Sequence, residues 1–392
     1  MDRGASEIPL AGREPLDWVS LLADEVGPRR PTGKAERAAA ELVREQLEEA
    51  GIPARLEGFL GYSTFAAPFA VILGLAVAPA LLAPGHRGLR SLLAVGSAAA
   101  LVSEGNLVRT PLSALLSRWP SQNVVAVIEP QGQPVRTLCL VCHLDTSRSG
   151  LMFHPRAARL LNPALQALSA ACLAQASEPL LGRSRRGRRV LTGVRATLGL
   201  AAALLLEREL RGEDVPGAND NASGVATVVR LALESASKPL RGTRLVTLMT
   251  GCEESGLLGS QAFLRSRETA GWMFVNFDNV GGPATLRFVR REGVWRRWDA
   301  DPGLVAVAER IASERPELAL APSDDPIGLT YDVSPVLARG GRGITFVAGD
   351  NGSIPNYHWP TDTTENVDPD SLDRAVAVGR EVLAAVDRGE AD

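Results

Sequence analysis

The sequence predicts an α/β protein with a mixed, mostly parallel central sheet and helices on both faces. Three observations lead to this fold class. Helical and strand patterns alternate regularly over residues 225–277. Acidic and histidine side chains follow apolar, β-branched runs or open helices, where α/β enzymes place their sites. Two apolar helical hairpins, at residues 65–108 and 155–208, interrupt this pattern. We therefore expect one domain over residues 1–392, interrupted by these hairpins.

The first part of the chain, from residue 14, predicts two helices and then three strands. Residues 35–50 are amphipathic and are followed by Gly51, a typical helix stop. Residues 52–59 alternate well enough to form a strand beside this helix. The apolar runs at 122–128 and 136–142 are two further strands, and the second of them leads directly into His143.

The second half of the chain returns to alternating elements. We predict helices at 225–235, 257–267, 303–315 and 369–386, and strands at 243–250, 272–277 and 343–347. Residues 286–290 and 294–298 are predicted to pair as a hairpin. This order is typical of a largely parallel sheet.

Composition describes an ordinary globular chain. It has 392 residues, 45% of them hydrophobic, and a formal net charge of -3, which gives no indication of nucleic-acid binding. Four cysteines lie in apolar runs and are too few for a disulfide framework, so a reducing compartment is permitted. The Cys139–Cys142–His143 spacing formally matches a haem attachment motif, but three-residue spacing on a strand places the two thiols on opposite faces. We find no secretory signal in the first sixty mixed, charged residues.

The two hairpins raise the question of a membrane. Residues 58–85 contain no charge, but the apolar core at 69–83 is bracketed by Pro68 and Pro79 and is shorter than the roughly 20 residues of a spanning helix. The second hairpin joins apolar segments 157–176 and 190–206 through a turn with five arginines at 183–189. We expect the two hairpins to pack on each other.

The arginines in the hairpin turns argue against hairpins that span the bilayer while the catalytic domain lies in the cytoplasm. Arg87 and Arg90 in the turn of the first hairpin, and the arginines of the second, would then lie outside, against the positive-inside tendency. Helices that lie in the headgroup region of an anionic leaflet fit both the short apolar lengths and the charge. We therefore expect a membrane-associated protein with its catalytic domain on the cytoplasmic side. A soluble cytoplasmic protein, whose hairpins form a lid or a contact between copies, is the alternative.

Candidate site residues are arranged around Asp220. This residue lies in the Gly- and Asn-rich stretch 217–224, which we interpret as a turn that opens a helix. The other candidates occur in separate motifs along the chain: His143, Asp145, Glu253, Glu254, Asp278 and His358. Singly, each could be a helix cap, a turn former or a solvated loop residue. Their combined order predicts a shared site.

These residue types suit zinc. Zinc binds histidine nitrogen and carboxylate oxygen, and a pair of metals needs a carboxylate that can bridge them. Asp145, two residues beyond His143, is placed to hold the other nitrogen of that imidazole. Of the adjacent pair, one glutamate can bind metal while the other takes a proton from water.

The set resembles the co-catalytic di-zinc aminopeptidase family, which includes bacterial leucyl aminopeptidases, plasma glutamate carboxypeptidase and glutaminyl cyclases. The resemblance covers most of the chain, from Arg29 in the stretch 25–33 to the motif around His358. Carried over position by position, it implies one zinc on His143 and Asp278, another on Glu254 and His358, and Asp220 as their bridge. It further implies Asp145 behind His143 and Glu253 as general base. Tyr331 and Asp332 are in a segment that runs near the site in this family.

The resemblance implies a metallo-aminopeptidase with two zinc ions that hydrolyses peptides with a free N-terminus. A carboxypeptidase or deacylase on the same metal pair, and a catalytically silent membrane scaffold, are the alternatives. The stretch Asp220–Asn221 with Ala222, Ser223 and Gly224 favours the aminopeptidase branch over the cyclases. Both hairpins depart from the compact secreted members of the family, so substrate access and location do not follow from the resemblance.

Overall fold

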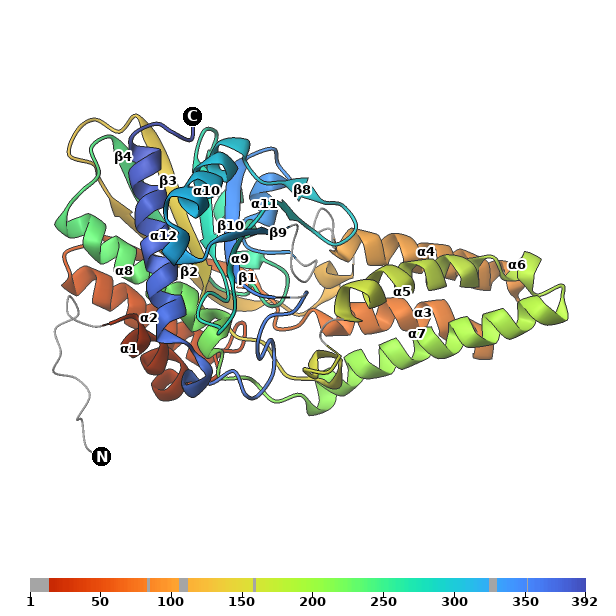
Figure 1. Ribbon diagram of the computed structural model, residues 1–392. Coiled ribbons are helices and arrows are strands. Elements are labelled where there is room, and N and C mark those ends of the chain that lie inside the picture. The colour runs from red at the N-terminus through yellow and green to blue at the C-terminus, as the bar shows by residue number, and fades with distance from the viewer. Residues whose placement is uncertain (1–13, 83–84, 106–111, 158–159, 324–329, 351) are drawn as a thin grey trace.

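An eight-stranded sheet forms the centre of the molecule (Figure 1). The computed structural model describes residues 14–82, 85–105, 112–157, 160–323, 330–350 and 352–392. The sheet order is β1-β2-β4-β3-β5-β10-β6-β9. The strands are β1 Ala54–Gly61, β2 Trp119–Ile128, β3 Arg136–His143, β4 Thr243–Thr250, β5 Met273–Phe277, β6 Leu286–Val289, β9 Ala321–Ser323 and β10 Arg342–Ala348.

The four central strands, β4, β3, β5 and β10, run parallel to one another. β3 pairs in parallel with β4 and β5, and β5 pairs in parallel with β10. β1 with β2, β2 with β4, and β10 with β6 are antiparallel. This mixed, mostly parallel sheet confirms the predicted fold class. Because parallel strands end at the same edge, the segments that follow β3, β4 and β5 meet there.

Helices cover both faces of the sheet. The larger core packs one face against α1 Pro15–Ser20, α2 Lys34–Glu49, α8 Ser223–Ser237, α10 Pro302–Glu314 and α12 Pro369–Asp387. The smaller core packs the other face against α9 Leu258–Arg265 and α11 Ser334–Leu337. Burial on two faces explains why β3 and β4 read as nearly continuous apolar runs.

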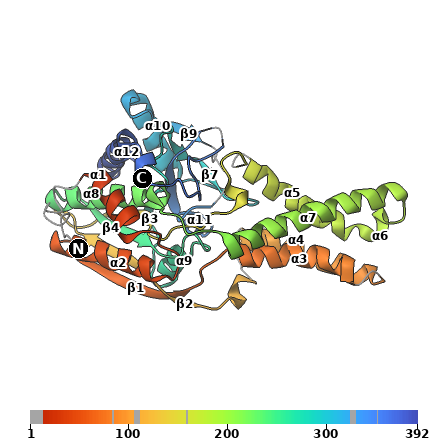
Figure 2. The same ribbon diagram turned by 90° about the horizontal axis from the view of Figure 1, so that it is seen from below.

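A helical bundle projects from one end of this body (Figures 1 and 2). It consists of α3 Ala66–Leu82, α4 Arg87–Gly105, α5 Leu161–Ala176 and α7 Arg185–Arg211, with the short α6 Glu178–Leu181 before α7. α3 packs against α4 and α7, and α5 packs against the same two helices. The expected packing of the hairpins on each other is therefore observed. Residues 83–84, 106–108 and 158–159 of the predicted hairpins lie outside the described residues.

The interior of the bundle is mostly apolar and contains a buried ion pair. Ile72, Leu73 and Leu198 are fully buried in it. Arg90 donates two hydrogen bonds of 2.8 and 2.7 Å to the carboxylate of Glu178, and both side chains are almost completely buried. Since each charge has its partner, the pair joins α4 to α6 without an unpaired buried charge.

One predicted hairpin is wrong. β6 pairs with β10 and β9 in the main sheet rather than with residues 294–298. The local hairpin is smaller and joins β7 Arg291–Glu292 to β8 Trp298–Asp299. The reason is burial: Phe288 and Val289 are fully enclosed, so this run needs strand partners on both sides.

Candidate metal centre

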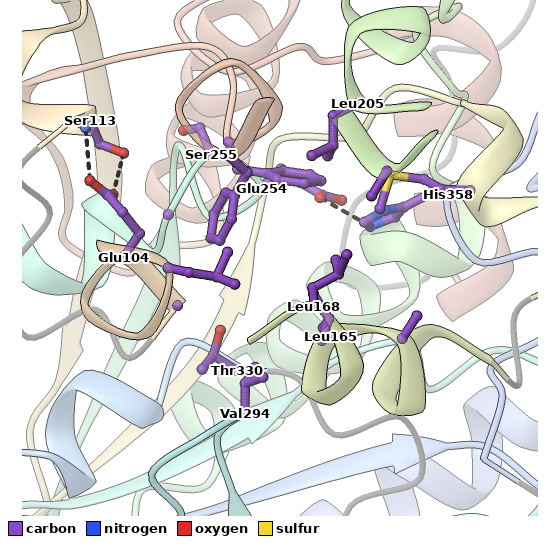
Figure 3. A pocket seen from close by; sticks show the side chains of 18 of the residues that line it. Glu104, Ser113, Leu165, Leu168, Leu205, Glu254, Ser255, Val294, Thr330 and His358 are labelled. Atoms are coloured by element: carbon purple, nitrogen blue, oxygen red, sulfur yellow. Dashed lines mark hydrogen bonds and ion pairs between the residues drawn. The ribbon is translucent and has the colours of Figure 1, made fainter. Parts of the chain in front are cut away.

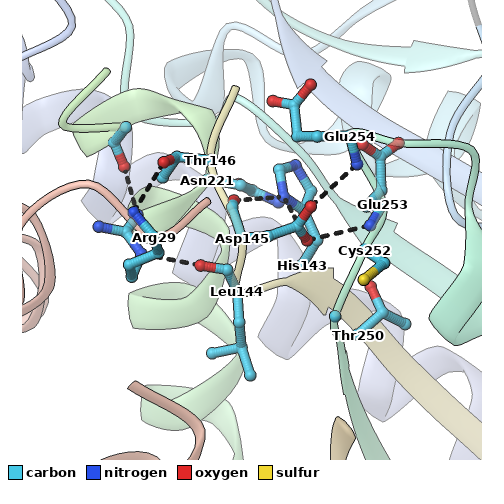
Figure 4. Close-up of polar contacts among 12 residues, drawn as sticks. Arg29, His143, Leu144, Asp145, Thr146, Asn221, Thr250, Cys252, Glu253 and Glu254 are labelled. Atoms are coloured by element: carbon cyan, nitrogen blue, oxygen red, sulfur yellow. Dashed lines mark hydrogen bonds and ion pairs between the residues drawn. The ribbon is translucent and has the colours of Figure 1, made fainter. Parts of the chain in front are cut away.

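The end of β3 presents His143 to the site. Its Nδ1 lies 3.0 Å from the backbone carbonyl oxygen of Asp145, so this carbonyl fixes the ring and leaves Nε2 facing the other candidates. The prediction that the Asp145 carboxylate holds this nitrogen differs from the structure, since that oxygen is 3.8 Å away. The carboxylate instead accepts hydrogen bonds of 3.0 Å from the backbone N–H groups of Glu253 and Glu254 (Figure 4). Asp145 thus links the strand that carries His143 to the turn with both glutamates.

Asp220 lies in an irregular turn directly before α8. Asp220 and Asn221 have non-helical backbone angles, and the Asn221 side chain accepts from the Gly224 N–H at 3.0 Å and donates to the Phe277 carbonyl at 3.0 Å. The carboxylate of Asp362 accepts from the backbone N–H of Asp220 at 3.0 Å. These contacts leave the Asp220 carboxylate free to face the site.

The turn after β4 carries Glu253 and Glu254 and is held from below by Glu36. The Glu36 carboxylate accepts from the backbone N–H groups of Cys252 at 2.9 Å and Thr32 at 3.0 Å, and from the Ser121 hydroxyl at 3.0 Å. Glu36 is almost completely buried. It therefore fixes the backbone immediately before Glu253.

Two rings position His358. The ring of Tyr357 stacks on the imidazole at a centroid separation of 3.8 Å, and Phe153 meets it edge-on at 4.4 Å. His358 adopts a positive φ of 50°, which orients the side chain from its loop. The imidazole therefore enters the site from the side that faces the bundle.

The structure brings the five predicted ligands into two clusters that share Asp220. In the first, His143 Nε2 lies 3.2 Å from Asp220 Oδ1 and 3.7 Å from Asp278 Oδ2. In the second, His358 Nε2 lies 3.3 Å from Asp220 Oδ2 and 3.0 Å from Glu254 Oε2. Each oxygen of Asp220 thus faces a different histidine, as a bridging carboxylate requires.

These spacings fit zinc. Tetrahedral ligand atoms at about 2.1 Å from zinc are separated by about 3.4 Å, close to the separations within both clusters. Among the described residues of the site, the carboxylate oxygens Asp220 Oδ2 and Glu254 Oε1 are buried without a hydrogen-bond partner. A buried acceptor without a donor is costly, and a cation would compensate it.

Electrostatics indicate the same requirement for positive charge. Burial raises the pKa of Asp278 and of Asp145 to about 6, and it raises the pKa of Glu253 well above its usual value. Burial opposes protonation of His358, but the Glu254 carboxylate outweighs it and raises the pKa of this imidazole to about 9. Asp220 keeps a pKa well below its usual range despite burial, because both histidines donate to it. Protons on the imidazoles thus balance charge that metal ions would otherwise balance.

Arg29 connects the two halves of the site. Its buried guanidinium donates to the carbonyl oxygens of Leu144 at 2.7 Å, Leu22 at 2.8 Å and Gly217 at 2.8 Å. It therefore joins the segment after β3 to the turn that carries Asp220 (Figure 4). Burial lowers the pKa of Arg29 to about 10, so it remains charged at neutral pH.

Sequence reasoning missed several supporting residues. Arg29 lies in the stretch 25–33 and Asp362 follows His358 by four residues, but their contacts were not predictable from spacing. Glu36 and Phe153 carried no sequence signal, since one is an acidic residue in an amphipathic helix and the other an isolated aromatic. Tyr331 and Asp332 are buried behind the site: Tyr331 packs with Val289, and Asp332 accepts from the Thr250 hydroxyl at 2.6 Å.

The fold and the paired clusters define the class of an α/β metallohydrolase with co-catalytic ligands. Residues 202–383 match the sequence model of Peptidase family M28. This match confirms the predicted resemblance to the co-catalytic di-zinc aminopeptidase family. Together with the two clusters, it supports a zinc-dependent exopeptidase.

Solved structures share the fold. The zinc aminopeptidase BSAP from Bacillus subtilis has a TM-score of 0.57 and 16% identity, over 97% of this chain and 96% of its own. The aminopeptidase of Aneurinibacillus sp. strain AM-1 has a TM-score of 0.56 and 14% identity, over 95% and 92%. The glutaminyl cyclase of Porphyromonas gingivalis has a TM-score of 0.56 and 17% identity, over 96% and 97%. Comparison with curated proteins finds no match.

Proposed function

We propose that this protein is a metallo-aminopeptidase that removes residues from the free N-terminus of peptides. Its catalytic domain spans residues 1–392, with the two hairpins as insertions. The observation that carries the proposal is the shared position of Asp220 between the His143–Asp278 and Glu254–His358 clusters. This arrangement suits two zinc ions, one in each cluster.

Each residue has a defined role in this proposal. His143 and Asp278 would hold one ion, Glu254 and His358 would hold the other, and Asp220 would be shared between them. Zinc, when bound, would supply a Lewis acid for the peptide carbonyl and would acidify water. Glu253 takes the proton from the attacking water and returns it to the leaving amine. Asp145 positions Glu253 through the hydrogen bond to its backbone N–H.

The Glu253→Gln variant tests this mechanism. Glutamine keeps the size of the side chain but cannot accept the proton, so we expect kcat to fall by about 10²–10⁴. Because Glu253 is not proposed as a ligand, zinc content should remain about two ions per chain by elemental analysis, as two clusters require. Glu49→Gln, on the exposed end of α2, is the matched control and should match the wild type.

The substrates decide between the proposed activity and its alternatives. Peptides with a free amine should be cleaved, whereas their N-acetylated forms should not. Preferential cleavage of the acylated forms would favour the deacylase or carboxypeptidase. Retained turnover in Glu253→Gln would contradict the assigned base. A chain without bound zinc at neutral pH would favour the silent scaffold.

We further propose that the bundle attaches the protein to the cytoplasmic face of a membrane. One described helix, α7, is long and apolar enough to cross a bilayer by length and composition, which by itself is weak support. Additional support comes from exposed apolar side chains on several bundle helices, including Leu92 at 68% and Leu200 at 63% exposure. Most of the large apolar side chains that are exposed in the described residues lie on these helices.

Charge at the far end of the bundle favours an anionic leaflet. The turn before α7 and its first residues carry exposed arginines at 183, 185, 186, 188 and 189, and Arg87 at the start of α4 is also exposed. Anionic lipids are concentrated on the cytoplasmic side and attract such clusters by about 1 kcal/mol per arginine. Helices lying on this surface would keep the arginines at the headgroups.

A further inference from the structure

An apolar cavity lies between the bundle and the metal centre. Its volume is about 260 Å³, and its lining includes Glu253, Glu254 and His358. Figure 3 shows Leu165, Leu168 and other apolar side chains around the space beside the Glu254–His358 pair. The cavity is therefore continuous with the residues proposed to act on the peptide bond.

All four long bundle helices contribute to its wall. Phe65 precedes α3, and the helices supply Phe69 from α3, Leu101 from α4, Leu168 from α5 and Leu205 from α7. The M28 match begins only at residue 202, near the end of α7. Most of this wall thus comes from segments that precede the matched region.

A chain of ring contacts connects this wall to a metal ligand. Phe69 meets Phe65 edge-on at 6.3 Å, Phe65 meets Phe153 at 6.4 Å, and Phe153 meets His358 at 4.4 Å. Edge-to-face contacts of this kind resist rearrangement because each ring is packed by the next. The cavity wall is therefore coupled to the ligand geometry.

The Glu104 carboxylate, across the cavity from Glu254 and His358, already has hydrogen-bond donors. Glu104 accepts from the Ser113 hydroxyl at 2.6 Å and from the backbone N–H groups of Leu112 and Ser113 at 2.6 and 3.1 Å. Figure 3 shows this carboxylate directed toward Ser113. With these donors engaged, the rest of the lining is mostly apolar, so the cavity favours apolar groups, as in most small-molecule sites. Its other polar groups include Ser255, Thr330 and the indole nitrogen of Trp295, which is buried without a hydrogen-bond partner in the described part of the chain.

We propose that this cavity binds a large apolar side chain, aromatic or long aliphatic, of the residue whose peptide bond is cleaved. The inserted bundle is then one half of the substrate site rather than only an attachment device. This inference rests on the proposed aminopeptidase function, since it assigns the side-chain specificity of the same site.

Leu168 offers a test with a matched control. Leu168→Trp fills the cavity from α5, whereas Leu173→Trp adds the same ring to an exposed position on the same helix. Wild-type protein should prefer Phe- and Leu-peptides over Ala-peptides. In Leu168→Trp the ratio of kcat/KM for Phe over Ala should fall at least tenfold, mainly through KM, because pocket contacts of this size carry about 10–200-fold discrimination. Leu173→Trp should keep the wild-type ratio.

A second variant distinguishes a change in the cavity from misfolding of Leu168→Trp. Leu168→Ala enlarges the cavity and should shift preference toward Trp-peptides relative to Leu-peptides. Equal ratios in wild type, Leu168→Trp and Leu168→Ala would overturn the inference. A preference for Lys-peptides that depends on Glu104 would overturn it as well, because it would assign the cavity to a basic side chain.

Measuring the affinity for amino acid amides tests the cavity assignment independently of the proposed aminopeptidase function. Calorimetry with zinc-loaded protein can compare phenylalaninamide with alaninamide in the absence of turnover. If no peptide is cleaved but phenylalaninamide binds at least tenfold more tightly, and Leu168→Trp removes this difference, the function fails and the cavity assignment stands. If peptides are cleaved without this difference in affinity, the function stands and the cavity assignment fails.

Discussion

Glu36 shows how a single buried residue can shape the site without touching substrate. Burial, and then the charge of Asp145, raises the pKa of Glu36 to about 8, although three donors favour its ionised form. An ordinary glutamic acid in the unfolded chain has a pKa of 4.5. The folded protein therefore binds this proton more tightly than the unfolded chain between these two values. Stability from Glu36 is fully present below pH 4.5 and is lost as pH rises toward 8.

The Glu36→Gln variant should lack this pH dependence. Because glutamine does not titrate, we expect the Tm of the variant relative to wild type to increase between pH 5 and pH 8, by about 2 °C or more. Thermal unfolding over this range measures the difference. Glu49→Gln, an exposed change on the same helix, should give a curve parallel to wild type. A parallel curve for Glu36→Gln would show that the buried carboxyl group does not titrate as inferred.

At the scale of elements, α7 joins the bundle to the body and depends on a close turn at its start. The Ser184 hydroxyl caps the helix by accepting from the Gly187 N–H at 2.9 Å. A Cβ at Gly187 would lie 1.9 Å from the carbonyl oxygen of Leu181, so this turn admits only glycine without rearrangement. Gly193 and Gly199, farther along α7, have open space around them.

Glycine-to-alanine substitutions at three positions of α7 should therefore change the stability of the bundle in different directions. Gly187→Ala should destabilise the bundle by about 1–3 kcal/mol through overpacking. Gly193→Ala and Gly199→Ala should each stabilise α7 by about 1 kcal/mol, because alanine favours the helix. Thermal unfolding and limited proteolysis of the bundle would measure these effects. A common response of all three variants would contradict the steric argument at Gly187.

At the scale of the whole molecule, the arrangement of the bundle determines which part of the protein would contact a membrane under the proposed attachment. The starts of α4 and α7 lie at the end of the bundle far from the sheet (Figures 1 and 2). The exposed arginines around the starts of α4 and α7 therefore lie on segments far from the sheet. This geometry would place the catalytic body beside the membrane rather than within it.

Vesicle sedimentation should detect this attachment. Wild-type protein should bind vesicles that contain phosphatidylserine more tightly than vesicles of phosphatidylcholine, and binding should weaken with salt. Replacing Arg185, Arg186, Arg188 and Arg189 with glutamine should reduce affinity at least 100-fold, since each arginine contributes about 1 kcal/mol. The control Lys238→Gln with Arg241→Gln, on the exposed surface of the body, should bind as wild type.

Other outcomes identify the rival arrangements. Extraction only by detergent, without dependence on salt, would indicate a bundle that spans the bilayer. Absence of vesicle binding together with self-association through the bundle would indicate the soluble form with a contact between copies.

Local patterns in the sequence were sufficient to predict the sheet, most helices and the set of candidate ligands. His143 ends a parallel strand, Glu254 and Asp278 follow two others, and Asp220 precedes α8, so their places at one sheet edge follow from regular geometry. His358 comes from a loop, and its place does not follow from such a pattern. The hairpin at 286–298 was mispredicted because the partners of β6 are β10 and β9, which follow later in the chain. Strand pairing over such separations has no local signature.

Only the tertiary structure decided which groups support these ligands and what covers them. The sequence by itself determined the chemistry available at Asp220, but not that Asp145 holds the glutamate turn or that Glu36 lies beneath it. It also determined that the hairpins are apolar, but not that their helices enclose a cavity against His358. Side-chain contacts between distant segments depend on how whole elements pack, and residue periodicity does not encode that packing.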